Sequence, residues 1–145
     1  MSAQAPQNYA NHRRFDKLYM VVEVLVALAV ILSIAGLVKG VTASSLSTFL
    51  LAVIAVVLVL KVRLYSLTVQ DRIVRLEMRL RLERVLPPDL KDRIPDLTLS
   101  QLIGLRFASD GELPTLVRQV LDERITKADE IKKRVKNWQA DHLRV

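Results

Sequence analysis

Two long apolar runs occupy the first half of the chain. Residues 18–38 read LYMVVEVLVALAVILSIAGLV, with Glu23 as their only charge, and residues 41–60 read VTASSLSTFLLAVIAVVLVL, with no charge. As an α-helix, each run of about 20 residues covers roughly the 30 Å hydrocarbon core of a bilayer. Val and Ile favour strands in water, but a lone strand cannot satisfy its backbone groups in lipid. The pattern therefore predicts two transmembrane helices.

The connection between the runs is short, consisting of Lys39 and Gly40, or of residues 39–45 if the Ser/Thr stretch forms a turn. Such a connection predicts an antiparallel hairpin over residues 18–65. The flanks on the side of the chain ends carry most of the nearby basic residues: Arg13, Arg14, Lys17, Lys61, Arg63, Arg72 and Arg75. The positive-inside rule then predicts a multi-pass inner-membrane protein with both termini in the cytoplasm. The polar segment 1–17 and the length of the first run favour an anchor over a cleaved signal peptide.

An amphipathic pattern follows the second run, without Pro or Gly before Pro87. Apolar residues recur at i, i+4, i+7 and i+11 on one helical face: Val69, Ile73, Leu76 and Leu80. We expect the second span to continue unbroken into this juxtamembrane helix, residues 66–86. Two ion pairs with the acid four residues before the base are expected along it: Asp71–Arg75 and Glu77–Arg81.

Short helices are predicted after Pro87 and Pro88, which end the amphipathic helix. The expected ranges are 89–94, 99–107, 110–125 and 127–138. The last three begin at capping patterns, namely Thr98 with Gln101, Ser109 with Glu112, and Thr126. Strand-like alternation is absent from the sequence, so the predicted class is all-α.

The predicted cytoplasmic domain, residues 87–145, is small. A core of fewer than about 60 residues is marginal alone. We therefore expect it to pack on the Leu76 and Leu80 stripe, on a second copy, or on a partner protein. Ile73, Leu76, Leu80 and Trp138 are the candidate docking residues, since a Trp in a polar C-terminal stretch is expected to be buried.

Composition excludes several kinds of chemistry. The 145 residues include no cysteine, which removes disulfides, thiolate metal sites and cysteine nucleophiles. The two histidines, His12 and His142, lie near opposite ends of the chain, so no histidine metal cluster is expected. The sequence also lacks a phosphate-binding Gly-rich loop, GxSxG, HExxH and a carboxylate pair beside a histidine. We expect no catalytic residues, no metal and no cofactor.

Glu23 lies roughly 9 Å from the cytoplasmic start of its run, and an ionisable residue at membrane depth is a functional candidate. A salt bridge to Lys61 or Arg63, extension of its side chain to the interface, or a contact with a partner subunit would satisfy it. A proton relay would need further acidic or histidine residues in the two runs, which hold none.

Basic residues beside the second run predict contact with anionic lipid. Lys61, Arg63 and Arg72 are the candidates for headgroup binding. Tyr19 and Tyr65 fall near the same predicted interface, as aromatic belt residues do. The arginines of residues 79–84 are expected to face solvent or protein. Nucleic-acid binding is disfavoured because this helix has no interleaved aromatic residues and its acids dilute the positive charge.

Four stretches in this order resemble a known family: QNYANHRRF (7–15), VQDRIVRLEMRLRLERVLPPDL (69–90), LRFASDGELPTLVRQVLDE (105–123) and IKKRVKNWQADHLRV (131–145). They resemble an uncharacterised bacterial family of small two-helix membrane proteins, a domain of unknown function, over nearly the whole chain. The resemblance implies a bacterial inner-membrane protein with an N-terminal hairpin and a helical cytoplasmic tail. It implies no activity and no functional residues.

These features favour a non-catalytic accessory subunit of a larger bacterial inner-membrane complex, of which a respiratory or photosynthetic complex is one kind. The alternative is a self-associating membrane scaffold, in which the amphipathic helix pairs with its own copy and the tail recruits a soluble protein. A membrane-tethered nucleic-acid binder is the third hypothesis.

Overall fold

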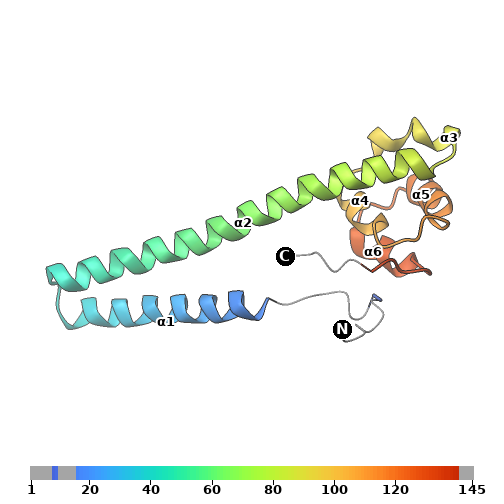
Figure 1. Ribbon diagram of the computed structural model, residues 1–145. Helices are drawn as coiled ribbons and strands as arrows, with labels where there is room; N and C mark the ends of the chain where they lie inside the picture. Colours follow the sequence, from blue (N-terminus) through green and yellow to red (C-terminus); the bar gives the residue numbers. More distant parts are fainter. Residues whose placement is uncertain (1–7, 10–15, 141–145) are drawn as a thin grey trace, which may run out of the picture. The chain divides into compact units, whose positions relative to one another are not determined.

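The described chain is all-helical, as the sequence predicts. Figure 1 shows the computed structural model, which describes residues 8–9 and 16–140. The helices in order are α1 (Lys17–Lys39), α2 (Ala43–Val85), α3 (Pro88–Lys91), the 3₁₀ helix η1 (Ile94–Asp96), α4 (Leu99–Leu105), α5 (Leu113–Asp122) and α6 (Ala128–Arg134). The described residues contain no β-strand, only an isolated antiparallel bridge between Ala108 and Trp138. His12, His142 and most of the predicted N-terminal segment 1–17 lie outside the described residues.

The chain divides into two compact units within α2, between Thr68 and Val69. One unit holds α1 and the first part of α2, and the other holds the remainder of α2 with α3 to α6. α2 itself is one unbroken helix of 43 residues. The absence of Pro and Gly before Pro87 accounts for this length, because no residue in it interrupts the backbone hydrogen bonds.

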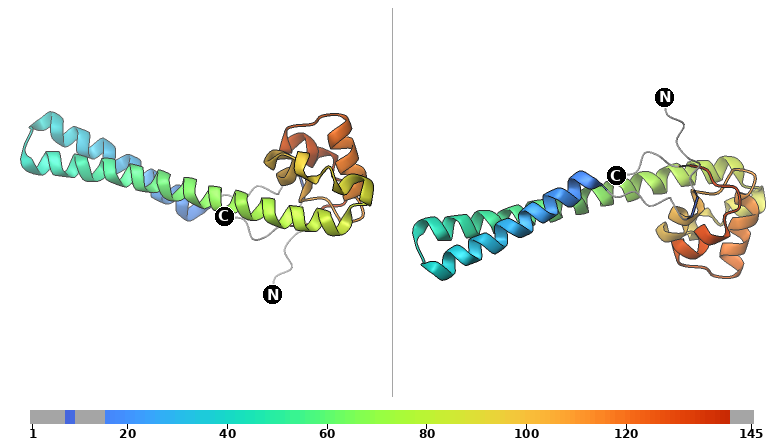
Figure 2. Two further views of the ribbon diagram at one scale, coloured as in Figure 1. Left: turned by 90° about the horizontal axis from the view of Figure 1, so that it is seen from above. Right: turned by 90° about the horizontal axis from the view of Figure 1, so that it is seen from below.

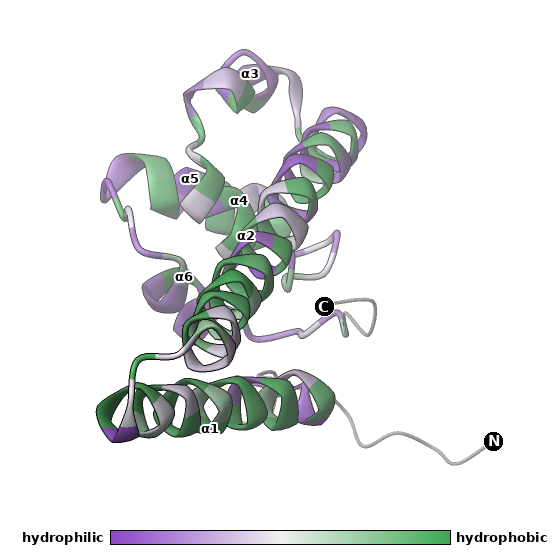
Figure 3. Cartoon of the chain, turned by 90° about the vertical axis from the view of Figure 1, so that its left-hand side faces the viewer, coloured by the Kyte–Doolittle hydropathy of each residue, from purple (hydrophilic) through white to green (hydrophobic). Residues whose placement is uncertain are grey.

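In the first unit, α1 matches the first predicted apolar run to within one residue at each end, and α2 begins two residues after the start of the second run and continues past its end. Both are long and apolar enough to cross a membrane, and α1 is hydrophobic over nearly its whole length (Figure 3). α1 begins after Asp16, whose carboxylate accepts hydrogen bonds from the backbone N–H of Leu18 and Tyr19 at 3.0 and 3.1 Å. Its C-cap residue is Gly40, whose N–H donates to the carbonyl of Gly36.

The two helices of this unit run side by side in opposite directions (Figures 1 and 2). The buried residues along them are small: Ser33 of α1 and Ala52 of α2. Small side chains allow helix backbones to approach closely. Most of the large apolar side chains of both helices are exposed. Among the other small residues of α1, Gly36 is half-buried and Ala29 is exposed.

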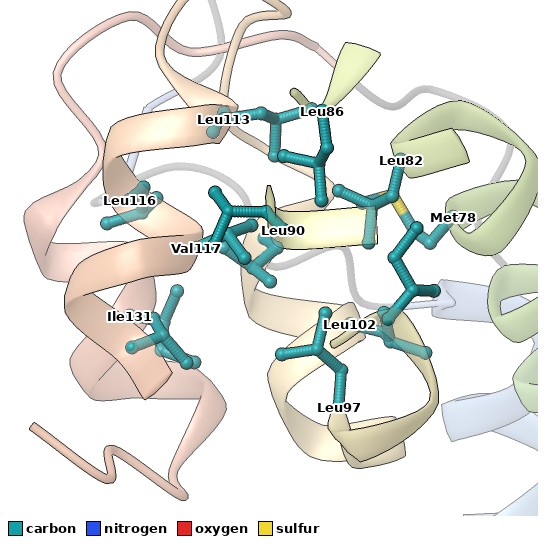
Figure 4. Packing of buried hydrophobic residues seen from close by; sticks show 14 of the residues in the cluster. Met78, Leu82, Leu86, Leu90, Leu97, Leu102, Leu113, Leu116, Val117 and Ile131 are labelled. Atoms are coloured by element: carbon teal, nitrogen blue, oxygen red, sulfur yellow. The ribbon is translucent and has the colours of Figure 1, made fainter. Parts of the chain in front are cut away.

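The second unit has a continuous hydrophobic core. Val74, Met78 and Leu82 of α2 and Leu86, which directly follows this helix, are all buried in it. Figure 4 shows the last three turned toward leucines of α3, α4 and α5, among them Leu90, Leu102 and Leu113. α4 also packs against α5 and α6.

Of the three alternatives expected for the packing of the small domain, the Leu76 and Leu80 face of α2 is not the one used. Leu76 and Leu80 are 61% and 64% exposed, whereas Leu82 is completely buried. At 100° per residue, Val74, Met78 and Leu82 lie on the opposite side of the helix from the predicted stripe. α2 therefore has two apolar faces beyond residue 68, and the face that contains Val74, Met78 and Leu82 holds the domain.

The capping predictions differ in outcome. Thr98 and Gln101 form the expected capping box at the start of α4. The box predicted for Ser109 and Glu112 is wrong: α5 begins at Leu113 without a side-chain cap. The carboxylate of Glu112 instead accepts backbone N–H bonds far along the chain, at 2.8 and 3.0 Å.

The last helix is also shorter than predicted. α6 covers Ala128–Arg134, and its N-cap residue is Lys127 rather than Thr126. The backbone N–H of Ala128 donates to the hydroxyl of Ser100 at 3.1 Å. A side chain from α4 thus accepts the hydrogen bond of the first N–H group of α6. A capping residue next to the helix in the sequence would usually do this.

Candidate contact surfaces

The first candidate surface is a group of aromatic and cationic side chains at one end of the first unit. The guanidinium carbon of Arg63 lies 5.1 Å from the ring centroid of Tyr19. The ammonium of Lys61 lies 5.4 Å from the ring centroid of Tyr65, and its Nζ is 3.4 Å from the Tyr65 hydroxyl. A cation above an aromatic ring is attracted by the negative face of the ring.

Glu23 belongs to the same neighbourhood. Its carboxylate interacts with the side chain of Tyr19, one turn earlier in α1, and its own side chain is exposed. Within the described residues, no ion pair of 4.0 Å or less joins Glu23 to Lys61 or Arg63. Tyr19 therefore has an acid and a base beside it, an arrangement that the sequence did not predict because Tyr19 and Arg63 are far apart along the chain.

The second candidate surface lies on α2 in the other unit. Its four apolar residues fall in a sector of roughly 60° and are all at least half exposed: Val69, Ile73, Leu76 and Leu80. We refer to these four residues as the α2 stripe. Arg72 and Arg79 lie on one flank of the stripe, and Glu77 and Arg84 lie on the other, all four exposed. The stripe is thus an apolar surface with charged edges, without a covering element in the described part of the chain.

Arg81 is not part of this surface, and the expected Glu77–Arg81 ion pair is wrong. The Arg81 side chain is only 14% exposed and forms its ion pair with Asp110, at 2.7 Å. It also donates to the carbonyls of Arg106 and Ala108, at 3.0 and 2.6 Å. The expected Asp71–Arg75 pair is likewise not formed within the described residues. Three acceptors in the α4–α5 connection outcompete one exposed carboxylate on the same helix.

Trp138 lies within the second unit. Its ring centroid is 4.9 Å from that of Phe107, and it is half-buried against the core. The strand-like bridge that holds it consists of bonds from Gln139 N–H to the Phe107 carbonyl at 2.7 Å and from Ser109 N–H to the Asn137 carbonyl at 3.0 Å. The domain itself therefore buries much of Trp138.

No group of three or more His, Cys, Asp or Glu residues that could hold a metal ion is present in the described ranges. The two surfaces consist of apolar, aromatic and charged groups. Together with the fold, they define a class: an all-helical protein with two helices long enough to span a membrane and a small helical domain.

Comparison with known proteins identifies the family of the chain. The model of a family of unknown function, DUF6526, matches residues 1–145. The chain belongs to this family, which confirms the resemblance found in the sequence. No curated protein and no solved structure matches the chain.

Proposed function

We propose that this protein is a non-catalytic accessory subunit of a larger bacterial inner-membrane complex. α1 and α2 up to residue 65 form a transmembrane hairpin with both termini in the cytoplasm, and the helical domain contacts the cytoplasmic face of the host complex. The observation that carries the proposal is the exposure of apolar surface in both units. The large apolar side chains of α1 and of the first part of α2 suit lipid and neighbouring spans, and the α2 stripe suits a protein partner.

Anionic lipid is the second expected partner. Lys61 and Arg63 lie at the end of the apolar part of α2, beside Tyr65 and Tyr19. Basic side chains and aromatic rings at this position match a phospholipid headgroup region. Arg72 is exposed two turns further along α2 and is the third candidate for headgroup contact.

The test is gentle detergent extraction from the native membrane, followed by native electrophoresis and mass spectrometry of the band. We expect the chain to migrate with foreign subunits in fixed stoichiometry. Migration alone, or as a small homo-oligomer, would overturn the proposal.

The membrane topology can be tested separately with single introduced cysteines. The chain contains no cysteine of its own that would react with the label. A membrane-impermeant thiol reagent should label Thr42→Cys in intact spheroplasts. Gly111→Cys, in the helical domain, should react only after the membrane is permeabilised. The reverse pattern would contradict the orientation.

A further inference from the structure

We infer that the α2 stripe is the seam of a parallel pair formed with a second copy of this chain. Its residues are separated by four, three and four positions, which places them alternately at positions d and a of a seven-residue repeat. Val69 and Leu76 occupy d, and Ile73 and Leu80 occupy a. Each is at least 50% exposed, so the full seam is available to a partner helix.

The parallel direction rests on the proposed membrane insertion. Copies inserted in the same orientation hold their α2 helices parallel and at the same height. In a parallel two-stranded coil, each a or d residue meets the same residue of the other copy. Ile73 and Leu76 then meet their own counterparts, and the seam closes without any shift between the chains.

Charges beside the stripe favour the same arrangement. Arg72 is at position g and Glu77 follows it by five residues at position e. In a parallel coil, a g residue faces the e residue of the next repeat on the other helix, so Arg72 meets the partner's Glu77. An antiparallel pair would instead place g residues opposite each other. Arg72 would then face the partner's Arg79, and the two like charges would repel.

The same rules set the length of the seam. The next d position after Leu80 is Glu83, and the next g–e pair is Arg79 with the partner's Arg84. Both oppose further pairing, so the seam covers about two heptads. Helices this short pair weakly in water, and the membrane anchors supply the alignment. The opposite face of α2 already holds the domain core through Met78 and Leu82, so a second copy displaces no core residue.

Single cysteines in this cysteine-free chain test the seam directly. Ile73→Cys, Leu76→Cys and Leu80→Cys are each oxidised mildly in membranes, with Arg75→Cys as the exposed control on another side of α2. We expect disulfide-linked dimers from all three seam variants, with at least tenfold less from Arg75→Cys. Equal yields at residues 75 and 76, or no dimer from any seam variant, would overturn the pair, the latter leaving the stripe to a different subunit.

A charge exchange tests the direction. In the Leu76→Cys background, Arg72→Glu should lower the dimer yield severalfold, and adding Glu77→Arg should restore it. No loss with Arg72→Glu, or no recovery in the exchanged variant, would contradict the g–e contact. Foreign subunits in the native band without seam cross-links would overturn the pair alone, whereas seam cross-links without foreign subunits would overturn the accessory function alone.

Discussion

Arg81 and Asp110 are 29 residues apart in the sequence, yet Nε of Arg81 donates to Oδ1 of Asp110 over 2.7 Å. The same guanidinium donates to the carbonyls of Arg106 and Ala108 and to the side chain of Gln139. A single residue of α2 thus provides hydrogen-bond donors to acceptors in the connection between α4 and α5. It also contacts the segment that carries Trp138. Buried carbonyls need such partners, since leaving them unpaired is costly.

Arg81→Ala should lower the free energy of unfolding of the helical domain by about 2–3 kcal/mol, because charged donors to several acceptors are lost together. Trp138 is the only Trp of the chain and contacts Phe107, so its fluorescence reports unfolding in denaturant. Arg79→Ala, on an exposed residue of the same helix, should change stability by less than about 0.5 kcal/mol. Equal losses in the two variants would show that Arg81 does not hold the domain.

Local sequence patterns predicted part of the local structure. The length of α2 follows from the absence of Pro and Gly, and the Thr98 box at α4 needs only neighbouring residues. The contacts of Arg81 and Glu112 could not be predicted, because their acceptors and donors come from elements more than 20 residues away. Glu112 fits a capping box in sequence, but two backbone N–H groups near α6 bind its carboxylate instead.

Which face of α2 packs into the core could not be predicted for a different reason. Both apolar faces of α2 beyond residue 68 repeat at helical spacing, so periodicity alone cannot tell which one is covered. Leu80 and Leu82 are two residues apart, yet one is 64% exposed and the other is completely buried. Only the packing of α3 to α6 distinguishes them. The candidate site residues on the stripe were found for their apolar spacing, whereas Tyr19 beside Arg63 depends on the pairing of α1 with α2.

Leu82→Ala and Leu80→Ala form a matched pair that checks this assignment. Leu82→Ala should lower the free energy of unfolding by about 2–5 kcal/mol, because it leaves a cavity in the core. Leu80→Ala should leave the unfolding of detergent-solubilised monomer within about 0.5 kcal/mol of the parent. Denaturant titration followed by Trp138 fluorescence measures both. A larger loss from Leu80→Ala would place the core on the stripe.

Gly104 lies where α4 packs against α6. A Cβ at this position would lie 2.8 Å from Cβ of Ile131 and 3.0 Å from the carbonyl oxygen of Ala128. Neither atom is the end of a flexible side chain, so α6 would have to move. We expect Gly104→Ala to destabilise the domain by about 1–3 kcal/mol, although Ala is the better helix former.

The control for this substitution is Gly111→Ala, since nothing lies within 4 Å of a Cβ there. Its thermal unfolding midpoint, measured by circular dichroism, should equal or slightly exceed that of the parent. A Gly104→Ala midpoint at or above that of Gly111→Ala would mean that α4 and α6 are not tightly packed.

The lipid contact makes a quantitative prediction for the two cations beside Tyr19 and Tyr65. Each basic residue near an anionic surface contributes about 1 kcal/mol, so replacing Lys61 and Arg63 by Gln should weaken the preference for phosphatidylglycerol over phosphatidylcholine by roughly 30-fold. Native mass spectrometry of lipids retained in mixed nanodiscs measures the preference. Lys127→Gln with Lys136→Gln removes the same charge from exposed positions of the helical domain and should leave the preference nearly unchanged. If both double variants lose the preference equally, net charge attracts the lipid, and the aromatic and cationic group on the first unit is not a headgroup site.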